Sequence, residues 1–245
     1  MTDQNGLPAP ASSPRPPAFK LLAQQLVNTA LDFFYPPQCI SCGRRVGSLL
    51  CPDCQAKIPT VLPAHESNSP LTERRATAEF DGAIQKAIHQ LKYTGQRSYA
   101  KALSQRLATE LARSGWQPDL ITAAPLHAAR LHERGYNQSD LLAEYLSLSS
   151  HIPFRPDAVQ RLRDTRPQVG LGFQDRQLNV ANAFRAEPGV VKDRKLVIID
   201  DVYTTGATLR ACATALLEAG AKQVWALTVA SAKSSQPLPS TTPEP

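Results

Sequence analysis

Hydrophobic and polar positions follow two different periods along this chain. Apolar residues recur at helical spacing in the segments that we predict as amphipathic helices: 20–34, 81–91, 98–113, 139–148 and 207–219. Short, nearly uninterrupted apolar runs are typical of buried strands, and they occupy residues 120–124, 195–199 and 223–229. Because strands and helices alternate from about residue 78 onward, the pattern predicts an α/β fold with a mostly parallel sheet.

Other stretches show no regular period. The first residues, 1–19, and the last, 233–245, are rich in Pro and Ser, so we expect a disordered leader and a disordered tail. The internal segment from Arg161 to Phe184 carries many Arg, Gln and Asn residues. We predict that this segment forms a loop with one short helix.

Four cysteines stand close together near the N-terminus, in the pattern C-x2-C-x8-C-x2-C: Cys39, Cys42, Cys51 and Cys54. Two CxxC pairs let four sulfurs surround one tetrahedral metal, so the spacing predicts a structural Zn²⁺ with no open position. The alternative is two disulfides in a secreted protein. The N-terminus lacks the plan of a signal peptide, so we expect a cytoplasmic protein with reduced thiols. The fifth cysteine, Cys212, falls in a helix pattern and is predicted to pack in the core.

The strongest chemical signal is the stretch VIIDDVYTTGATL, in which two acidic residues end an apolar run. Ligands of open α/β sheets bind outside the carboxyl ends of the strands, where we expect Asp200 and Asp201 to lie. Their carboxylates suit two neighbouring ribose hydroxyls, with Mg²⁺ close by. The turn after them suits a 5′-phosphate at a helix N-terminus, and its residues are Thr204, Thr205, Gly206, Ala207 and Thr208.

The alternative for this stretch is an ordinary strand–turn–helix whose threonines only cap the helix. Capping explains one threonine, and one aspartate at most, but not two acids followed by three threonines. The stretch also lacks the Gly-Lys-Ser/Thr sequence of an ATP-binding P-loop, which excludes that class of phosphate site. We therefore interpret it as a site for a ribose phosphate.

Composition adds little to this picture. The chain is 42% hydrophobic and 20% charged, which is typical of a globular protein. No apolar run approaches the roughly 20 residues needed to cross a bilayer, so we expect no membrane span. The formal net charge of +6 permits contact with polyanions but does not require it.

The stretch DDVYTTGAT resembles the phosphoribosyl-pyrophosphate (PRPP) signature of type I phosphoribosyltransferases. From about residue 22 to 230, the chain resembles the ComF family, which joins a zinc ribbon to a phosphoribosyltransferase-like domain and is linked to natural competence. The resemblance rests on the four-cysteine module and, in order after it, LKYTGQ (91–96), APLHAARLHERGYNQSDLLAE (124–144), RPQVGLGFQDRQLNVANAF (166–184) and the PRPP signature. It implies a type I phosphoribosyltransferase fold.

Combined with the resemblance, these patterns predict four parts of the chain. A disordered leader covers 1–19, and a helix with the zinc-ribbon module covers 20–62. The phosphoribosyltransferase-like domain covers 76–232, and a disordered tail covers 233–245.

The resemblance also implies roles for individual residues. Asp200 and Asp201 become the candidate catalytic and PRPP-binding carboxylates, together with the threonine turn. The candidates for binding pyrophosphate, or for the mobile loop that covers substrate, are Lys92, His127, Arg130, Arg134 and Arg166.

Simpler explanations exist for some of these residues. Arg130 and Arg134 also suit a solvated basic face, and Lys92 also suits the end of a helix, where a cation is favourable. Asn137 matches the family motif but also suits the cap of the helix that follows it.

For function, the resemblance implies a protein that binds PRPP with Mg²⁺ and handles incoming single-stranded DNA in natural transformation, with competence or DNA-processing proteins as possible partners. Binding of single strands needs a basic groove with aromatic side chains, and the aromatics near basic residues are Tyr93, Tyr99, Tyr136 and Phe173. One alternative is an active phosphoribosyltransferase with an unknown acceptor, although no element for reading a nucleobase is evident. Another is a PRPP-sensing scaffold that docks partners through its zinc ribbon.

Overall fold

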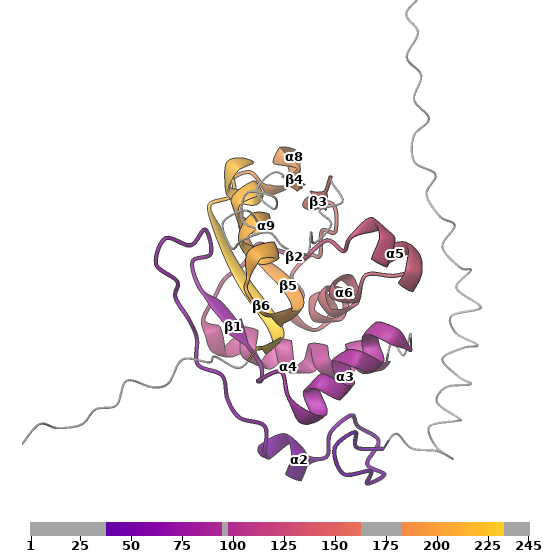
Figure 1. Ribbon diagram of the computed structural model, residues 1–245. Helices are drawn as coiled ribbons and strands as arrows, with labels where there is room; N and C mark the ends of the chain where they lie inside the picture. Colours follow the sequence, from indigo (N-terminus) through magenta and orange to yellow (C-terminus); the bar gives the residue numbers. More distant parts are fainter. Residues whose placement is uncertain (1–37, 95–97, 163–182, 233–245) are drawn as a thin grey trace, which may run out of the picture.

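The computed structural model describes residues 38–94, 98–162 and 183–232 (Figure 1). The predicted helix at 20–34, the leader, the tail and Arg166 lie outside these residues. Among the described residues, no helix is both long and apolar enough to cross a membrane.

The centre of the molecule is a four-stranded sheet whose neighbouring strands all run parallel. Its order is β1 (Arg74–Ala76), β6 (Gln223–Ser231), β5 (Lys195–Tyr203) and β2 (Leu120–Ala123). The three longer strands confirm the strands predicted from apolar runs. Strand β1 was not predicted, because three residues are too few to show a period.

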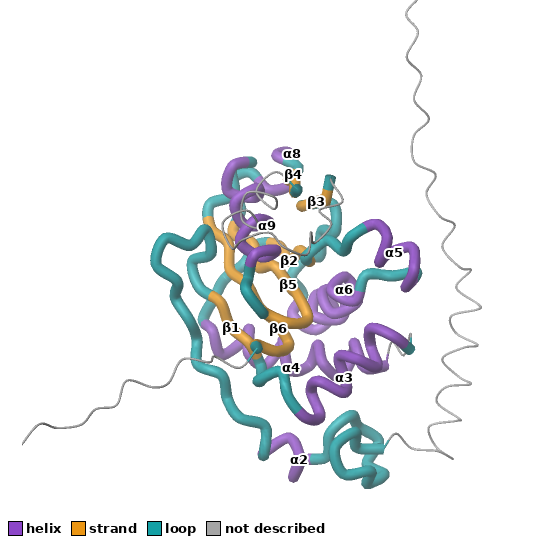
Figure 2. Tube along the Cα trace, viewed as in Figure 1, coloured by secondary structure: helices purple, strands orange, loops and turns teal. Residues whose placement is uncertain are grey.

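Helices cover both faces of this sheet (Figures 1 and 2). One face carries α3 (Gly82–Tyr93), α4 (Ser98–Ser114) and α6 (Gln138–Ser150), and the other carries α9 (Ala207–Glu218). All four confirm predicted helices, with bounds that differ by a few residues. The parallel sheet between two helical layers is the predicted α/β fold.

The side chains of β5 divide between two cores because successive residues of a strand point to opposite faces. Val197 and Ile199 belong to the buried cluster that includes α3, α4 and α6. Leu196 and Ile198 belong to the cluster that includes α9. Cys212 of α9 is fully buried in that second cluster, which confirms its predicted place in the core, and burial raises the pKa of its thiol.

Strand β5 does not end at Ile199, where the apolar run predicts its end, but continues through both aspartates to Tyr203. Its pairing with β2 stops at Ile199, whereas its pairing with β6 continues to Tyr203 and Ser231. The apolar run of β5 therefore ends where its neighbour β2 ends, whereas β5 itself continues for four more residues. Asp200 and Asp201 lie on a stretch that is paired on one side only.

Two short strands correct the prediction of a loop from Arg161 to Phe184. Strand β3 (Val159–Arg161) pairs antiparallel with β4 (Phe184–Ala186), so each end of that segment is extended. Residues 163–182 between them lie outside the described residues. The other helices among the described residues were not predicted, since each spans two turns or fewer. They are α2 (Pro52–Ala56), α5 (Ala128–Arg134) and α8 (Pro188–Val191).

Candidate functional site

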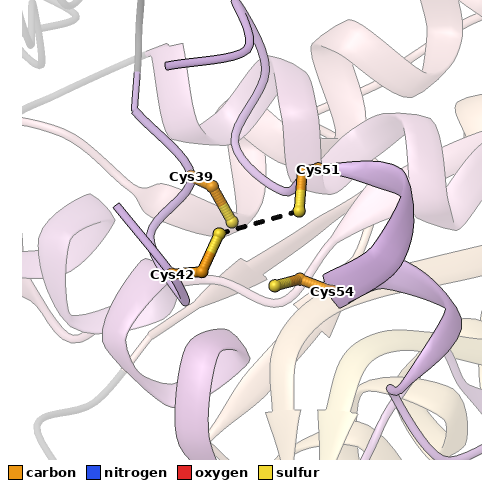
Figure 3. Close-up of side chains that lie close together, drawn as sticks. All are labelled: Cys39, Cys42, Cys51 and Cys54. Atoms are coloured by element: carbon orange, nitrogen blue, oxygen red, sulfur yellow. Dashed lines mark hydrogen bonds between the residues drawn. The ribbon is translucent and has the colours of Figure 1, made fainter. Parts of the chain in front are cut away.

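The four cysteines of the zinc-ribbon module converge on one point (Figure 3). Their sulfur atoms all lie within 4.8 Å of one another, and the Sγ atoms of Cys42 and Cys51 are 3.7 Å apart. Such a set of four soft ligands suits a tetrahedral, structural Zn²⁺. The chain has five cysteines, and the fifth, Cys212, is buried in α9. The cysteines of the chain therefore supply one such four-sulfur site.

Backbone turns bring the sulfurs together. Gly43 and Gly47 have φ angles of 73° and 67°, which favour glycine, and the Gly43 N–H donates to the Cys39 carbonyl. Burial opposes ionisation of the Cys39 thiol, but hydrogen bonds from backbone N–H groups outweigh it and lower its pKa to about 6. A thiol that ionises readily is suited to bind metal.

The metal module is not a separate body. Cys39, Leu50 and Cys51 are buried in the same hydrophobic cluster as Ile84 and Ile88 of α3. In Figure 1, the module lies directly below α3. The zinc ribbon therefore supports the helical layer that covers the sheet.

The second candidate site is a hollow of about 50 Å³ at the end of β5. Asp200 lines it together with the threonine turn, and the lining residues include Thr204, Thr205, Gly206, Ala207 and Thr208. Gly206 has a φ of 72° and is the N-cap residue of α9. Glycine offers no capping side chain, but the Thr205 hydroxyl oxygen accepts from the Ala207 N–H at 3.4 Å. The hollow thus combines a carboxylate with the N-terminus of a twelve-residue helix.

Asp200 is held in position by two hydrogen bonds to the same oxygen. Its Oδ1 accepts from the Ser139 hydroxyl at 2.8 Å and from the Asp201 backbone N–H at 2.8 Å. Burial, followed by the charge of Asp201, raises the pKa of Asp200 to about 7. Without a ligand, this carboxyl therefore holds a proton near neutral pH more readily than a free aspartate does.

Asp201 has a different environment from Asp200. Its side chain is buried, it is not among the residues that line the hollow, and its Oδ2 lies 2.9 Å from Nζ of Lys92. Lys92 is in the last turn of α3, so this ion pair joins the helical layer to the sheet. Of the two carboxylates that the sequence predicts for one ribose, Asp200 lines the hollow and Asp201 does not.

A polar network behind the threonine turn was not predicted. The Tyr203 hydroxyl donates to Glu66, and Arg210 donates to Glu66, to the Tyr203 hydroxyl and, at 2.7 Å, to the Thr205 carbonyl. Arg74 binds Glu66 at 3.0 Å and lies over the Tyr203 ring. Glu66, which precedes Tyr203 by 137 positions in the chain, therefore helps to hold the threonine turn in place.

Tyr203 also explains the glycine at the turn. A Cβ atom on Gly206 would lie 1.9 Å from the Tyr203 hydroxyl oxygen and 2.2 Å from Cζ. The position therefore requires glycine twice, for the left-handed backbone and for the close approach of the ring.

The remaining cationic candidates follow β2. His127 caps α5, and its Nδ1 lies 3.2 Å from the Ala129 N–H, while Arg130 is exposed on α5. Arg134 donates to the Gln138 side chain at 2.9 Å. Asn137 is buried and caps α6 by accepting from the Ser139 N–H, which confirms its expected capping role.

Comparison with known families agrees with this division of the chain. Residues 30–65 match the double zinc ribbon domain, and residues 155–243 match the phosphoribosyl transferase domain. With the parallel sheet, these matches identify a type I phosphoribosyltransferase fold preceded by a zinc ribbon.

Curated relatives extend the match over most of the chain. The DNA utilization protein YhgH of Escherichia coli (strain K12) is 38% identical over 208 residues, covering 77% of this chain and 88% of the relative. Competence protein F of Haemophilus influenzae is 40% identical over 116 residues, covering 45% of this chain and 50% of the relative. Competence protein ComFC of Bacillus subtilis is 26% identical over 186 residues, covering 74% and 72%.

Proposed function

Because this chain belongs to the ComF family of competence and DNA utilization proteins, we propose that it binds PRPP with Mg²⁺ and handles incoming single-stranded DNA during natural transformation. The observation that carries the first half of this proposal is the hollow at the end of β5. It places a carboxylate beside the N-terminus of α9, whose N-cap residue is a glycine.

The 5′-phosphate is assigned to the threonine turn. The first backbone N–H groups of a helix lack intrahelical partners and attract anions, and the first residues of α9 line the hollow. The exposed Thr204 and Thr205 add hydroxyl donors on the same rim. The network of Glu66, Tyr203 and Arg210 keeps the turn in this shape before any ligand arrives.

The ribose is assigned to Asp200, which is the aspartate that lines the hollow. Its carboxylate suits a ribose hydroxyl and, once ionised, a Mg²⁺ ion shared with the oxygens of PRPP. Asp201 acts from behind, because its ion pair with Lys92 fixes the end of β5 against α3. Mg²⁺ would neutralise the charge of the pyrophosphate group.

The pyrophosphate is assigned to the loop that follows β2 and ends at His127, the N-cap residue of α5. Strands β2 and β5 are parallel neighbours, so the chain segments that follow them begin at the same edge of the sheet. Lys92 forms an ion pair with Asp201, so we place it at the edge of the proposed pyrophosphate site and not within it. Turnover with an acceptor would be detected as pyrophosphate release from PRPP.

Calorimetric titration of PRPP and Mg²⁺ into the zinc-loaded protein tests the proposal. We expect saturable binding by the wild type and a loss of at least tenfold in affinity for Asp200→Asn, which keeps the shape but removes the charge. Asp157→Asn is the control, since Asp157 is an exposed carboxylate paired with Arg155 outside the hollow. No binding to the folded wild type, or equal binding by both variants, would refute this site.

The single substitution Asp200→Asn tests the site more specifically than a change of both aspartates does. Asp201→Asn would leave the Lys92 ammonium in a largely buried place without its partner, and loss of folding would then be confused with loss of binding.

A further inference from the structure

One aromatic ring stands out on the surface of the described residues. Five large apolar side chains remain exposed there, and Tyr93 is the only aromatic one, with 67% of its surface exposed. It is the last residue of α3 and follows Lys92 directly, so it adjoins the ion pair with Asp201.

The Tyr93 ring is held by neighbours and is not a loose side chain. The Arg134 guanidinium carbon lies 5.2 Å from the ring centroid, and the His89 ring, one turn earlier on α3, lies 5.5 Å away at an angle of 50°. The Tyr136 hydroxyl donates to the Leu91 carbonyl, which joins the segment after α5 to the end of α3. These contacts orient the ring while leaving most of it exposed.

The surroundings of this ring are basic. Lys86 and His89 precede Tyr93 by seven and four residues, so all three lie on one exposed side of α3. Across from them, α5 carries Arg130 and ends with Arg134. Helices α3 and α5 together contain four Lys or Arg residues and one acidic residue, Glu133.

We infer that this surface, formed by Lys86, His89, Tyr93, Arg130 and Arg134, binds single-stranded DNA. An unpaired base stacks on the Tyr93 ring, and Lys86 and Arg130 neutralise phosphates on either side. A duplex does not offer the faces of its bases, so single strands are preferred. The inference rests on the proposed handling of DNA and names the surface that performs it.

The experiment measures fluorescence anisotropy of a labelled oligothymidylate of about 16 nucleotides at low salt, with the zinc-loaded full chain. Tyr93→Ala is expected to weaken binding by about fivefold to more than a hundredfold, because it removes one stacking contact. Tyr93→Phe keeps the ring and should bind nearly as the wild type does. A duplex of the same length should bind more weakly than the single strand.

Leu148→Ala is the matched control, because Leu148 is 69% exposed on α6 and is not part of this surface. It should leave DNA binding unchanged. Arg130→Gln tests the phosphate contact separately: it should reduce the slope of log affinity against log salt by about 0.7, whereas Tyr93→Ala should keep the slope.

A parallel titration with PRPP and Mg²⁺ separates this inference from the proposed function. Tyr93→Ala should bind PRPP as the wild type does, since Tyr93 does not line the hollow. If the wild type binds single strands and Tyr93→Ala binds them equally well, the surface is wrong and the proposed function stands. If the wild type binds no single strands, the DNA-handling half of the proposed function fails with it, and the PRPP half is decided by its own titration.

Discussion

The substitution Gly206→Ala probes the threonine turn without touching any charged group. Gly206 has a φ of 72°, and an added methyl would lie 1.9 Å from the Tyr203 hydroxyl oxygen. A left-handed backbone costs a non-glycine residue about 1–2 kcal/mol. Forcing a methyl against a packed ring costs a further ~1–3 kcal/mol, since Glu66 and Arg210 hold the ring in place.

Gly115 provides a control with the same backbone. Its φ is also 72°, but no heavy atom lies within 4 Å of the position that a Cβ would take. Gly115→Ala should therefore cost only the backbone strain, about 1–2 kcal/mol. Gly206→Ala should cost about 2–5 kcal/mol in free energy of unfolding, which is the sum of the two contributions.

Urea denaturation of the zinc-loaded protein measures both values, and PRPP titration measures the functional effect. We expect Gly206→Ala to bind PRPP more weakly, because the clash displaces the turn, and Gly115→Ala to bind it normally. The double variant Gly206→Ala/Tyr203→Ala should show a favourable coupling energy, since removing the ring removes the clash. Equal destabilisation by the two glycine substitutions would refute the role assigned to Tyr203.

Other predictions concern the metal, the buried ion pair and the raised pKa. Cys42→Ser should lower the zinc content and the melting temperature together, measured by metal analysis and circular dichroism, and unchanged melting would contradict a shared core. Lys92→Met should destabilise the fold by about 3–5 kcal/mol by leaving Asp201 unpaired, and adding Asp201→Asn should restore part of that loss. The folded chain keeps a proton on Asp200 up to about pH 7, whereas the unfolded chain releases it near pH 4. Its contribution to stability is therefore complete below about pH 4 and is lost as pH rises through 7, so Asp200→Asn should gain in unfolding free energy relative to the wild type at pH 8 but not at pH 4. A constant difference across that range would contradict the raised pKa.

Most of the sheet and its covering helices could be predicted, because β2, β5 and β6 contain nearly uninterrupted apolar runs and the helices are amphipathic. The separation of Asp200 from Asp201 follows from strand geometry, which points successive side chains to opposite faces. The continuation of β5 past Ile199 could not be predicted, since it depends on β6 continuing where β2 ends. Strand pairing of this kind joins residues that are far apart in sequence, and no local pattern records where a neighbour stops.

The polar network that supports the threonine turn could not be predicted either, because its residues are far apart in the sequence. Glu66 meets Tyr203 and Arg210 across 137 and 144 positions, and nothing in the segment around Glu66 marks it as a partner of the turn. Arg134 was predicted as a cation for pyrophosphate from its place after β2. The structure adds its contact with the Tyr93 ring, which a linear motif does not contain.

Helix α3 links the two ends of the molecule. Its buried side shares a core with Cys39 and Cys51, and its last turn carries the lysine that pairs with Asp201. In a cell that is short of zinc, the module would lose its metal and no longer support the buried side of α3. The ion pair between Lys92 and Asp201 would then no longer fix the end of β5. Zinc supply would in this way affect the proposed binding of PRPP and of single-stranded DNA, although the metal lies away from both proposed sites.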